Sequence, residues 1–184
     1  KRIVEESLGK PVDRLFDEFT DEPEAAASLA QVHRAVLSNG KKVAVKIKRP
    51  GIETQIDTDL LIMQRLARFV DRNTRFLDPL SAVEMVEEFS LQIRKELSFR
   101  NEFLNIQKFR KAGEDDESII IPRPYEEYTT DDVLVLAFVE GENISKVIES
   151  DDPRYNKKQI VKNATDFLVT HMLFEGLLHA DPHP

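Results

Sequence analysis

Residues 25–51 read AAASLAQVHRAVLSNGKKVAVKIKRPG. The dipeptide Asn39-Gly40 separates two runs rich in Val and Ala, and Asn-Gly between such runs is a strong signal for a β-hairpin. We therefore predict adjacent antiparallel strands over 29–36 and 42–48. Because side chains alternate between the two faces of a strand, Lys46 should lie on the face opposite the valines of the second strand.

Hydrophobic periodicity extends this hairpin into a larger unit toward the C-terminus. Apolar residues recur at helical spacing in four stretches, and Ala112-Gly113 is expected to end the second of them. Two β-rich runs, joined by a loop with Pro122 and Pro124, should add to the hairpin in one sheet. Strands and helices in segregated blocks indicate an α+β architecture. The predicted helices cover 52–73, about 79 to beyond 109, 144–149 and 157–175, and the further strands cover 118–121 and 133–138.

The segment Glu140-Gly141-Glu142-Asn143 interrupts this pattern and is the best candidate for a hinge. We predict a mixed lobe over 1–139, with an antiparallel sheet and a helical insert. Residues 140–184 should hold the hinge and the truncated start of a helical lobe. The first residues have the character of the middle of an amphipathic helix, and the last lie in a loop, so we expect a chain that is cut at both ends.

The composition excludes several classes of protein. The formal net charge of the 184 residues is -8 at pH 7, whereas a nucleic-acid binder needs clustered Lys and Arg, so no nucleic-acid partner is expected. The chain has no cysteine, which excludes a disulfide framework and thiolate metal sites. The longest apolar run, 133–139, is far shorter than the roughly 20 residues that span a bilayer.

The first candidate for chemistry is Lys46, in the run Val43-Ala44-Val45-Lys46. A strand lysine that faces inward can place its ammonium on the α and β phosphates of a nucleotide, provided that a carboxylate holds it in position. Alone the pattern is weak. Because lysine is rarely buried, the alternative is an edge-strand lysine in water.

The second candidate is the pair Glu96 and Glu102 on the following helix. At 100° per residue, these two side chains are about 120° apart around a continuous helix, so they should have different partners. Taken singly, the default for either is an ordinary solvated glutamate, given the abundant charge nearby.

The third candidate is Asp181, in the run HADPHP over 179–184. An aspartate in a proline-restricted loop after a helix suits a base that orients a hydroxyl or water for phosphoryl transfer. The flanking His179 and His183 also raise the possibility of a metal site. That alternative is disfavoured, because a tight zinc or iron site draws further ligands and only His33 and His171 remain.

The order of these parts is more informative than any one of them. The order begins with an alanine-rich turn, a Val-Ala-Val-Lys strand and a glutamate-bearing helix. These are followed by a strand that leads into a Gly-containing linker, and then by a helix that leads to His-x-Asp. That is the order of parts in a protein-kinase fold.

Several stretches are also similar to the UbiB family of atypical kinases and ATPases linked to quinone biosynthesis. AAASLAQVH followed by VAVKIKRPG is the most specific part of the resemblance, which covers nearly the whole chain. The matching stretches are 8–11 (LGKP), 25–33, 43–51, Glu96-Leu97 with Phe99 and Glu102, and 179–184.

The resemblance implies a role for each matching residue. Lys46 would be the ATP lysine, Glu102 its helix partner and Asp181 the catalytic aspartate. Glu96 would belong to a Glu-Leu-Asp motif that engages an N-terminal extension over the active site. The nucleotide would be held by a turn that replaces the Gly-rich loop and by the backbone of the linker: Ala25, Ala26, Ala27, Ser28, Leu29, Ala30 and Gln31 in the turn, and Ala137 and Val139 in the linker. For the alanines of the turn, the alternative is that they are simply packed small residues.

The chain departs from the family pattern in three places. Ser98 stands where the Glu-Leu-Asp motif has its aspartate, and the Lys-x-Gly-Gln motif of the N-terminal extension is absent. The chain also stops before the Asn and Asp-Phe-Gly that bind metal in a kinase fold. Because phosphoryl transfer depends on metal ions that neutralise the phosphates, we expect no metal site in these residues and no activity from them alone.

The resemblance thus implies an ATP-dependent kinase or ATPase that supports synthesis of ubiquinone or a related quinone lipid. ATP or ADP would bind here, with Mg²⁺ in the longer parent protein. Quinone-pathway lipid intermediates and biosynthetic proteins are the partners it implies, at the cytoplasmic face of a bacterial membrane or in a mitochondrion or plastid. The alternative is a nucleotide-sensing, pseudokinase-like binding module that regulates a biosynthetic complex. A purely helical interaction domain leaves the Asn39-Gly40 hairpin unexplained.

Overall fold

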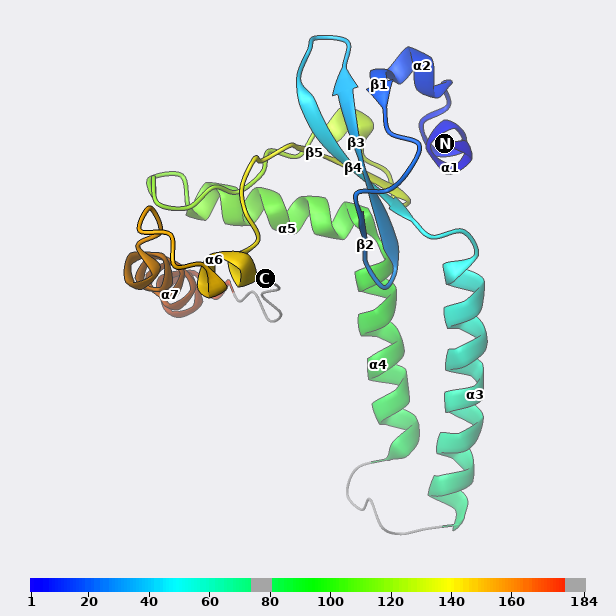
Figure 1. Cartoon of the computed structure of the whole chain (residues 1–184). Coiled ribbons are helices and arrows are strands. Elements are labelled where there is room, and N and C mark those ends of the chain that lie inside the picture. The colour runs from blue at the N-terminus through cyan, green and yellow to red at the C-terminus, as the bar shows by residue number, and fades with distance from the viewer. Residues whose placement is uncertain (74–80, 178–184) are drawn as a thin grey trace.

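The computed structural model describes residues 1–73 and 81–177, and its strands form an antiparallel sheet, at the top of the view in Figure 1. The strand order is β1-β3-β4-β5, and β2 also pairs with β3. The strands are β1 (Phe16–Phe19), β2 (Ala25–Ala26), β3 (Ala30–Leu37), β4 (Lys42–Lys48) and β5 (Val133–Ala137). The sheet and its helices confirm the predicted α+β class, whereas the division into lobes at residues 139 and 140 stays a prediction.

Seven α-helices and one 3-10 helix lie in the described part of the chain. They are α1 (Arg2–Leu8), α2 (Val12–Leu15), α3 (Ile52–Asn73), α4 (Ala82–Leu97), α5 (Phe99–Ala112), η1 (Glu126–Tyr128), α6 (Ile144–Glu149) and α7 (Lys157–Glu175). Helices α3 and α4 run side by side away from the sheet, and α5 turns from the end of α4 to run beneath it (Figure 1). In the ranges that the structure describes, no helix is long and apolar enough to cross a bilayer.

The hairpin of β3 and β4 forms where the sequence predicts it. The Gly40 amide donates to the Leu37 carbonyl at 2.8 Å, and the Leu37 amide donates to the Lys41 carbonyl at 2.9 Å. Gly40 has φ of 77°, in the left-handed region that glycine enters without a Cβ clash. The Asn-Gly turn therefore fixes the register in which Val32 lies opposite Lys46.

The two faces of the sheet carry different cores. Val43, Val45 and Ile47 of β4 point to one face and are buried with residues of α1 and α2. On the other face, Leu134 of β5 packs against Phe99 and Phe103 of α5. This division places α5 on the face that Lys46 shares, because alternate residues of a strand face opposite ways.

Two predictions about the elements are wrong. Residues 118–121 form no strand, because the Ser118 side chain and amide bond to Asp116 in a turn, and the chain joins β5 only after Pro122, through the isolated pair Pro124 and Leu136. The single helix expected from about 79 to beyond 109 is broken at Ser98, whose backbone is extended (φ -88°, ψ 112°). Strands β1 and β2 were not predicted, since runs of four and two residues carry too little periodicity.

The α3–α4 hairpin is joined near its far end by Asp71. Its carboxylate accepts hydrogen bonds from the Ser81 hydroxyl at 2.7 Å and from the amides of Ala82 at 2.8 Å and Val83 at 3.2 Å. The Ser81 hydroxyl and then the Ala82 amide hold the pKa of Asp71 below its usual range. Asp71 therefore supplies acceptors to amides in the first turn of α4, which a helix cannot satisfy internally.

The sheet-to-α5 core should be far more sensitive to truncation than the neighbouring helix surface. Phe103→Ala should lower the free energy of unfolding by about 3–5 kcal/mol, because it removes a buried ring from the contact with Leu134. Leu104→Ala, at a half-exposed position one residue along, should cost about 0.5 kcal/mol or less. Urea unfolding of both variants measures this, and equal losses would show that α5 does not pack as described.

Candidate functional site

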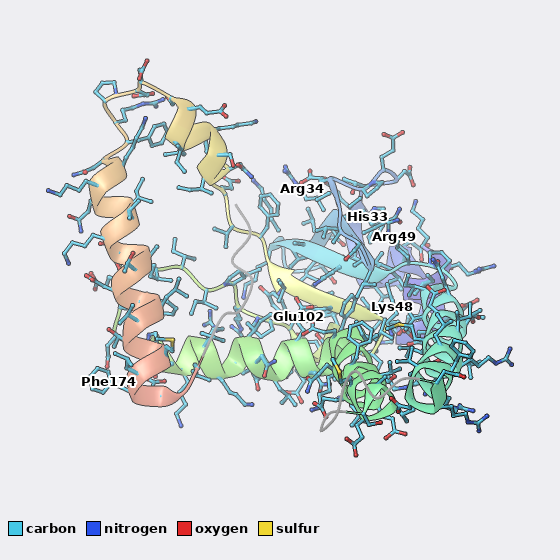
Figure 2. All side chains as sticks on the ribbon, turned by 90° about the horizontal axis from the view of Figure 1, so that it is seen from below. His33, Arg34, Lys48, Arg49, Glu102 and Phe174 are labelled. Carbon is cyan, nitrogen blue, oxygen red and sulfur yellow. The ribbon has the colours of Figure 1, made fainter. Side chains whose placement is uncertain are left out.

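Lys46 of β4 and Glu102 of α5 form an ion pair on the face of the sheet that α5 covers. The Lys46 Nζ donates to the two carboxylate oxygens of Glu102, at 2.9 Å to Oε1 and 2.7 Å to Oε2. Both side chains are about one third exposed or less (27% and 34%), and the Phe99 ring centroid lies 5.0 Å from the ammonium. Figure 2 shows Glu102 on α5, beneath the strands. The predicted ion pair is therefore confirmed, and the carboxylate holds the ammonium in one place.

Local sequence explains why Glu102 reaches this position. Helix α5 begins at Phe99, so Glu102 lies in its first turn, where the helix dipole favours a carboxylate. Phe99, Phe103 and Ile106 recur at three- and four-residue spacing and pack on the sheet. Glu102 is carried toward the strand by the same face of the helix.

Glu96 lies on the other side of the helix break. It is exposed on α4 and takes part in none of the ion pairs of the described residues, so Glu102 and not Glu96 is the partner of Lys46. The angle expected between the two glutamates assumed one continuous helix, and that assumption is wrong because α4 ends at Leu97. The role of Glu96 toward an N-terminal extension stays a prediction.

The alanine-rich turn is a tight reversal between β2 and β3. Ala25 pairs with Val32 and Ala26 with Gln31, and the Ala27 amide donates to the Ala30 carbonyl at 2.9 Å. The side chains of Ala25, Ala26, Ala27 and Ser28 are exposed, so the alternative that these alanines are packed small residues is wrong.

The remaining residues of the turn differ in exposure. Leu29 and Gln31 are half-buried, whereas Ala30 is buried in the core with Phe99 and Phe103. The Ala30 side chain is therefore a core group, which leaves only its backbone for a ligand. No described residue other than glycine has a positive φ, so the turn is built without strained alanines.

At the linker, the structure narrows the expected contacts with adenine. The Ala137 amide donates to the Arg123 carbonyl at 2.7 Å, so it is not free to donate to a base. The carbonyl oxygen is the group of Ala137 that remains for this role. Val139 is 41% exposed, and its contact with a nucleotide stays a prediction.

Lys48 is a buried cation near the candidate site, but not part of it, that the sequence did not single out. It lies two residues beyond Lys46, it is almost fully buried, and it pairs with Glu53 at 2.7 Å and Asp132 at 2.8 Å. Burial by itself lowers the pKa of the Lys48 ammonium, but the hydrogen bonds to Asp132 and Glu53 outweigh burial and raise the pKa above its ordinary value. Because its two partners lie in different elements, nothing in the local sequence could have identified this pairing.

Ser98, which stands where the family motif has an aspartate, bonds to the segment before β5. The Ser98 hydroxyl donates to Asp131 Oδ1 at 2.6 Å, and the Phe99 amide donates to the Asp131 carbonyl at 3.2 Å. The hydroxyl thus takes a carboxylate from the β5 side as its partner at the junction of α4 and α5.

Asp181, with His179 and His183, lies outside the described residues, so its catalytic role stays a prediction. Within 1–73 and 81–177, no group of three or more His, Asp or Glu side chains is arranged to hold a metal ion.

A lysine on an antiparallel sheet, paired with a glutamate on a helix that crosses that sheet, is the arrangement of a protein-kinase-like nucleotide-binding domain. The comparisons with known proteins agree. The family model described as the ABC1 atypical kinase-like domain matches residues 1–184, and the chain belongs to that family.

Curated relatives and a solved structure cover the whole chain. A chloroplastic aarF domain-containing protein kinase of Arabidopsis thaliana is 39% identical over 99% of the chain and 25% of its own length. A probable protein kinase UbiB of Cellvibrio japonicus is 35% identical over 100% of the chain and 33% of its own length. The Rv3197–erythromycin complex from Mycobacterium tuberculosis matches with a TM-score of 0.85 and 28% identity, over 100% of the chain and 45% of that protein. The chain thus spans about a quarter to a third of these curated relatives.

The conformation of the alanine turn should affect the ratio of ATP to ADP affinity. Ala27→Gly in the full-length protein should change the ratio of ATP to ADP affinity by about two- to threefold, because glycine admits backbone conformations that aim further N–H groups at phosphates. Ala164→Gly, at an exposed position of α7, is the matched control and should leave the ratio unchanged. Titration of both nucleotides decides. A lowered melting temperature with an unchanged ratio would exclude a phosphate-shaping role.

Proposed function

We propose that this chain is the nucleotide-binding part of an ATP-dependent atypical kinase or ATPase of the UbiB type, which supports synthesis of ubiquinone or a related quinone lipid. The observation that carries the proposal is the ion pair of Lys46 and Glu102 on the sheet face that α5 covers. The names of the relatives as protein kinases support it.

Lys46 has the charge and the solvent exposure that a contact with a nucleotide phosphate requires. An ammonium has three donors, and two of those on Lys46 bond to Glu102, which leaves one for a phosphate oxygen. The side chain is 27% exposed, so a ligand can reach it without unfolding the site. In a protein of net charge -8, such a positioned cation gives an anionic ligand a defined place to bind.

In the proposed mechanism, Lys46 donates to an oxygen of the α or β phosphate, Glu102 fixes the Lys46 ammonium, and the turn of residues 25–31 lies along the phosphates. The linker orients the base through the Ala137 carbonyl. Mg²⁺ would supply charge neutralisation between the β and γ phosphates. The described residues offer no cluster of ligands for that ion, so no step is assigned to a metal held by them.

The further elements of the proposal come from the family. Quinone-pathway lipid intermediates and biosynthetic proteins are the proposed partners, at a bacterial or organellar membrane surface. The relatives include bacterial proteins and chloroplast proteins, which supports either location.

Loss of the Lys46 ammonium should weaken nucleotide binding. In the full-length protein, Lys46→Met should raise the ATP dissociation constant by about tenfold or more, because a charge-assisted contact with the phosphates is lost. Lys48→Met is the matched control, since it removes the next cation on the same strand. It should lower the melting temperature but change ATP affinity by less than about threefold, because Lys48 is committed to Glu53 and Asp132. Isothermal titration measures both, and equal affinity of Lys46→Met and the unmodified protein would exclude Lys46 as the ATP lysine.

Asp181 should be needed for turnover and not for binding. Asp181→Asn in the full-length protein should abolish ATP turnover while leaving the dissociation constant within about threefold, because the carboxylate orients the attacking group and contacts the nucleotide little. A coupled ADP-release assay and a binding titration separate the two effects. Undiminished turnover would remove Asp181 from the mechanism. ATP binding by the unmodified protein with no turnover would favour the nucleotide-sensing module.

A further inference from the structure

Arg34 joins two segments next to the predicted nucleotide-binding turn and linker, which lie more than 100 residues apart in the sequence. Its Nε lies 2.8 Å from Glu24 Oε1, and its Nη2 donates to Glu24 Oε2 at 3.0 Å. Its Cζ lies 4.3 Å from the centroid of the Phe138 ring. Glu24 directly precedes the alanine turn, and Phe138 is the first residue of the linker after β5.

The Arg34 side chain lies on the face of the sheet that carries Lys46 and that α5 covers. Arg34 is directly opposite Ala44, and Val32 is directly opposite Lys46. Because alternate residues of β4 share a face, Arg34 and Lys46 are on the same side of the sheet. Figure 2 shows Arg34 at the side of the sheet from which the linker leads to α6.

The backbone of Arg34 is paired with Thr20 through both its amide and its carbonyl. The Arg34 amide donates to Thr20 Oγ1 at 3.1 Å, and the Thr20 amide donates to the Arg34 carbonyl at 2.9 Å. The Glu24 amide donates to the Val32 carbonyl at 2.8 Å, so the backbone of the residue that carries the partner carboxylate is also held to β3. The guanidinium therefore bridges two anchored segments.

A second cation holds the same linker. Lys42 of β4 pairs with Glu140 at 2.9 Å. The Lys42 hydrogen bond and charge are the main causes that lower the pKa of Glu140, and the charge of Arg34 adds to them. Both contacts tie the start of the linker to the strands β3 and β4.

We propose that Arg34 is a positioning residue that straps the alanine turn to the linker and thereby sets the spacing between these two parts of the proposed nucleotide site. The expected effect on nucleotide binding rests on the proposed function, whereas the link that Arg34 makes between the turn and the linker does not. Arginine suits the position because its planar fork pairs with both Glu24 oxygens while its Cζ lies over the Phe138 ring. Lysine, a point charge without a fork, cannot make both contacts at once. An ordinary surface ion pair would engage the guanidinium on one side alone.

The strap is tested first in the full-length protein without nucleotide. Glu24→Gln should raise the hydrogen-exchange rate of the amides over 138–143 by about two- to fivefold, because the released guanidinium holds Phe138 less firmly. Asp57→Asn breaks the Arg94–Asp57 pair, which is of similar length (2.7 Å) and exposure and lies on α3 and α4. This control should leave linker exchange unchanged. Unchanged exchange in Glu24→Gln, or an equal increase in the control, would overturn the strap.

The effect on nucleotide is then measured with Arg34→Lys, which keeps the charge and removes the fork. The ATP dissociation constant and the KM for ATP should rise by about three- to tenfold, with kcat within about twofold of the unmodified protein. Arg94→Lys is the matched control and should change none of them. Unaltered ATP affinity in Arg34→Lys would refute the claim that Arg34 positions the turn and the linker for nucleotide. Failure of the unmodified protein to bind ATP would instead refute the proposed function, and the exchange experiment would still decide the strap.

Discussion

The ion pair of Lys46 and Glu102 is the interaction on which the candidate site depends. Two independent periodicities have to agree for it to form, since β4 must turn Lys46 away from its valines and α5 must turn Glu102 toward the sheet. A rotation of α5 by one residue, about 100°, would carry the carboxylate away from the strand. Because both side chains are partly exposed, the pair adds little stability, on the order of 1 kcal/mol or less. Its importance lies in position, and the apolar core of Phe99 and Phe103 maintains that position.

The helical hairpin is held to this site by two consecutive aspartates before β5. Asp131 bonds to Ser98 and to the Phe99 amide, where α4 gives way to α5. Asp132 pairs with the buried Lys48, which also pairs with Glu53 in the first turn of α3. One short segment therefore fixes both ends of the α3–α4 insertion next to the strand that carries Lys46. Breaking the Lys48 contacts would leave a buried charge uncompensated, which is far more costly than losing a surface pair.

Much of this arrangement was predictable from the sequence, for reasons that are local. The Asn39-Gly40 turn, the alternation of β4 and the amphipathic pattern of α3 each act within a few residues. The partnership of Lys46 with Glu102 followed from the order of parts and the family resemblance together. The break at Ser98 was not predictable, because the apolar pattern continues through it and the cause is a contact with Asp131, 33 residues away. For the same reason the Lys48 cluster and the Arg34 contacts escaped prediction, since each depends on which strands become neighbours.

The most direct measurement of the central claim is a structure of the full-length protein with Mg²⁺ and a non-hydrolysable ATP analogue. The account predicts that the Lys46 Nζ lies within hydrogen-bond distance, about 2.7–3.2 Å, of an α or β phosphate oxygen while Glu102 still accepts from it. It also predicts that the turn of residues 25–31 lies along the phosphates. An analogue bound elsewhere, with Lys46 paired to Glu102 alone, would contradict the assignment of this sheet face as the nucleotide site.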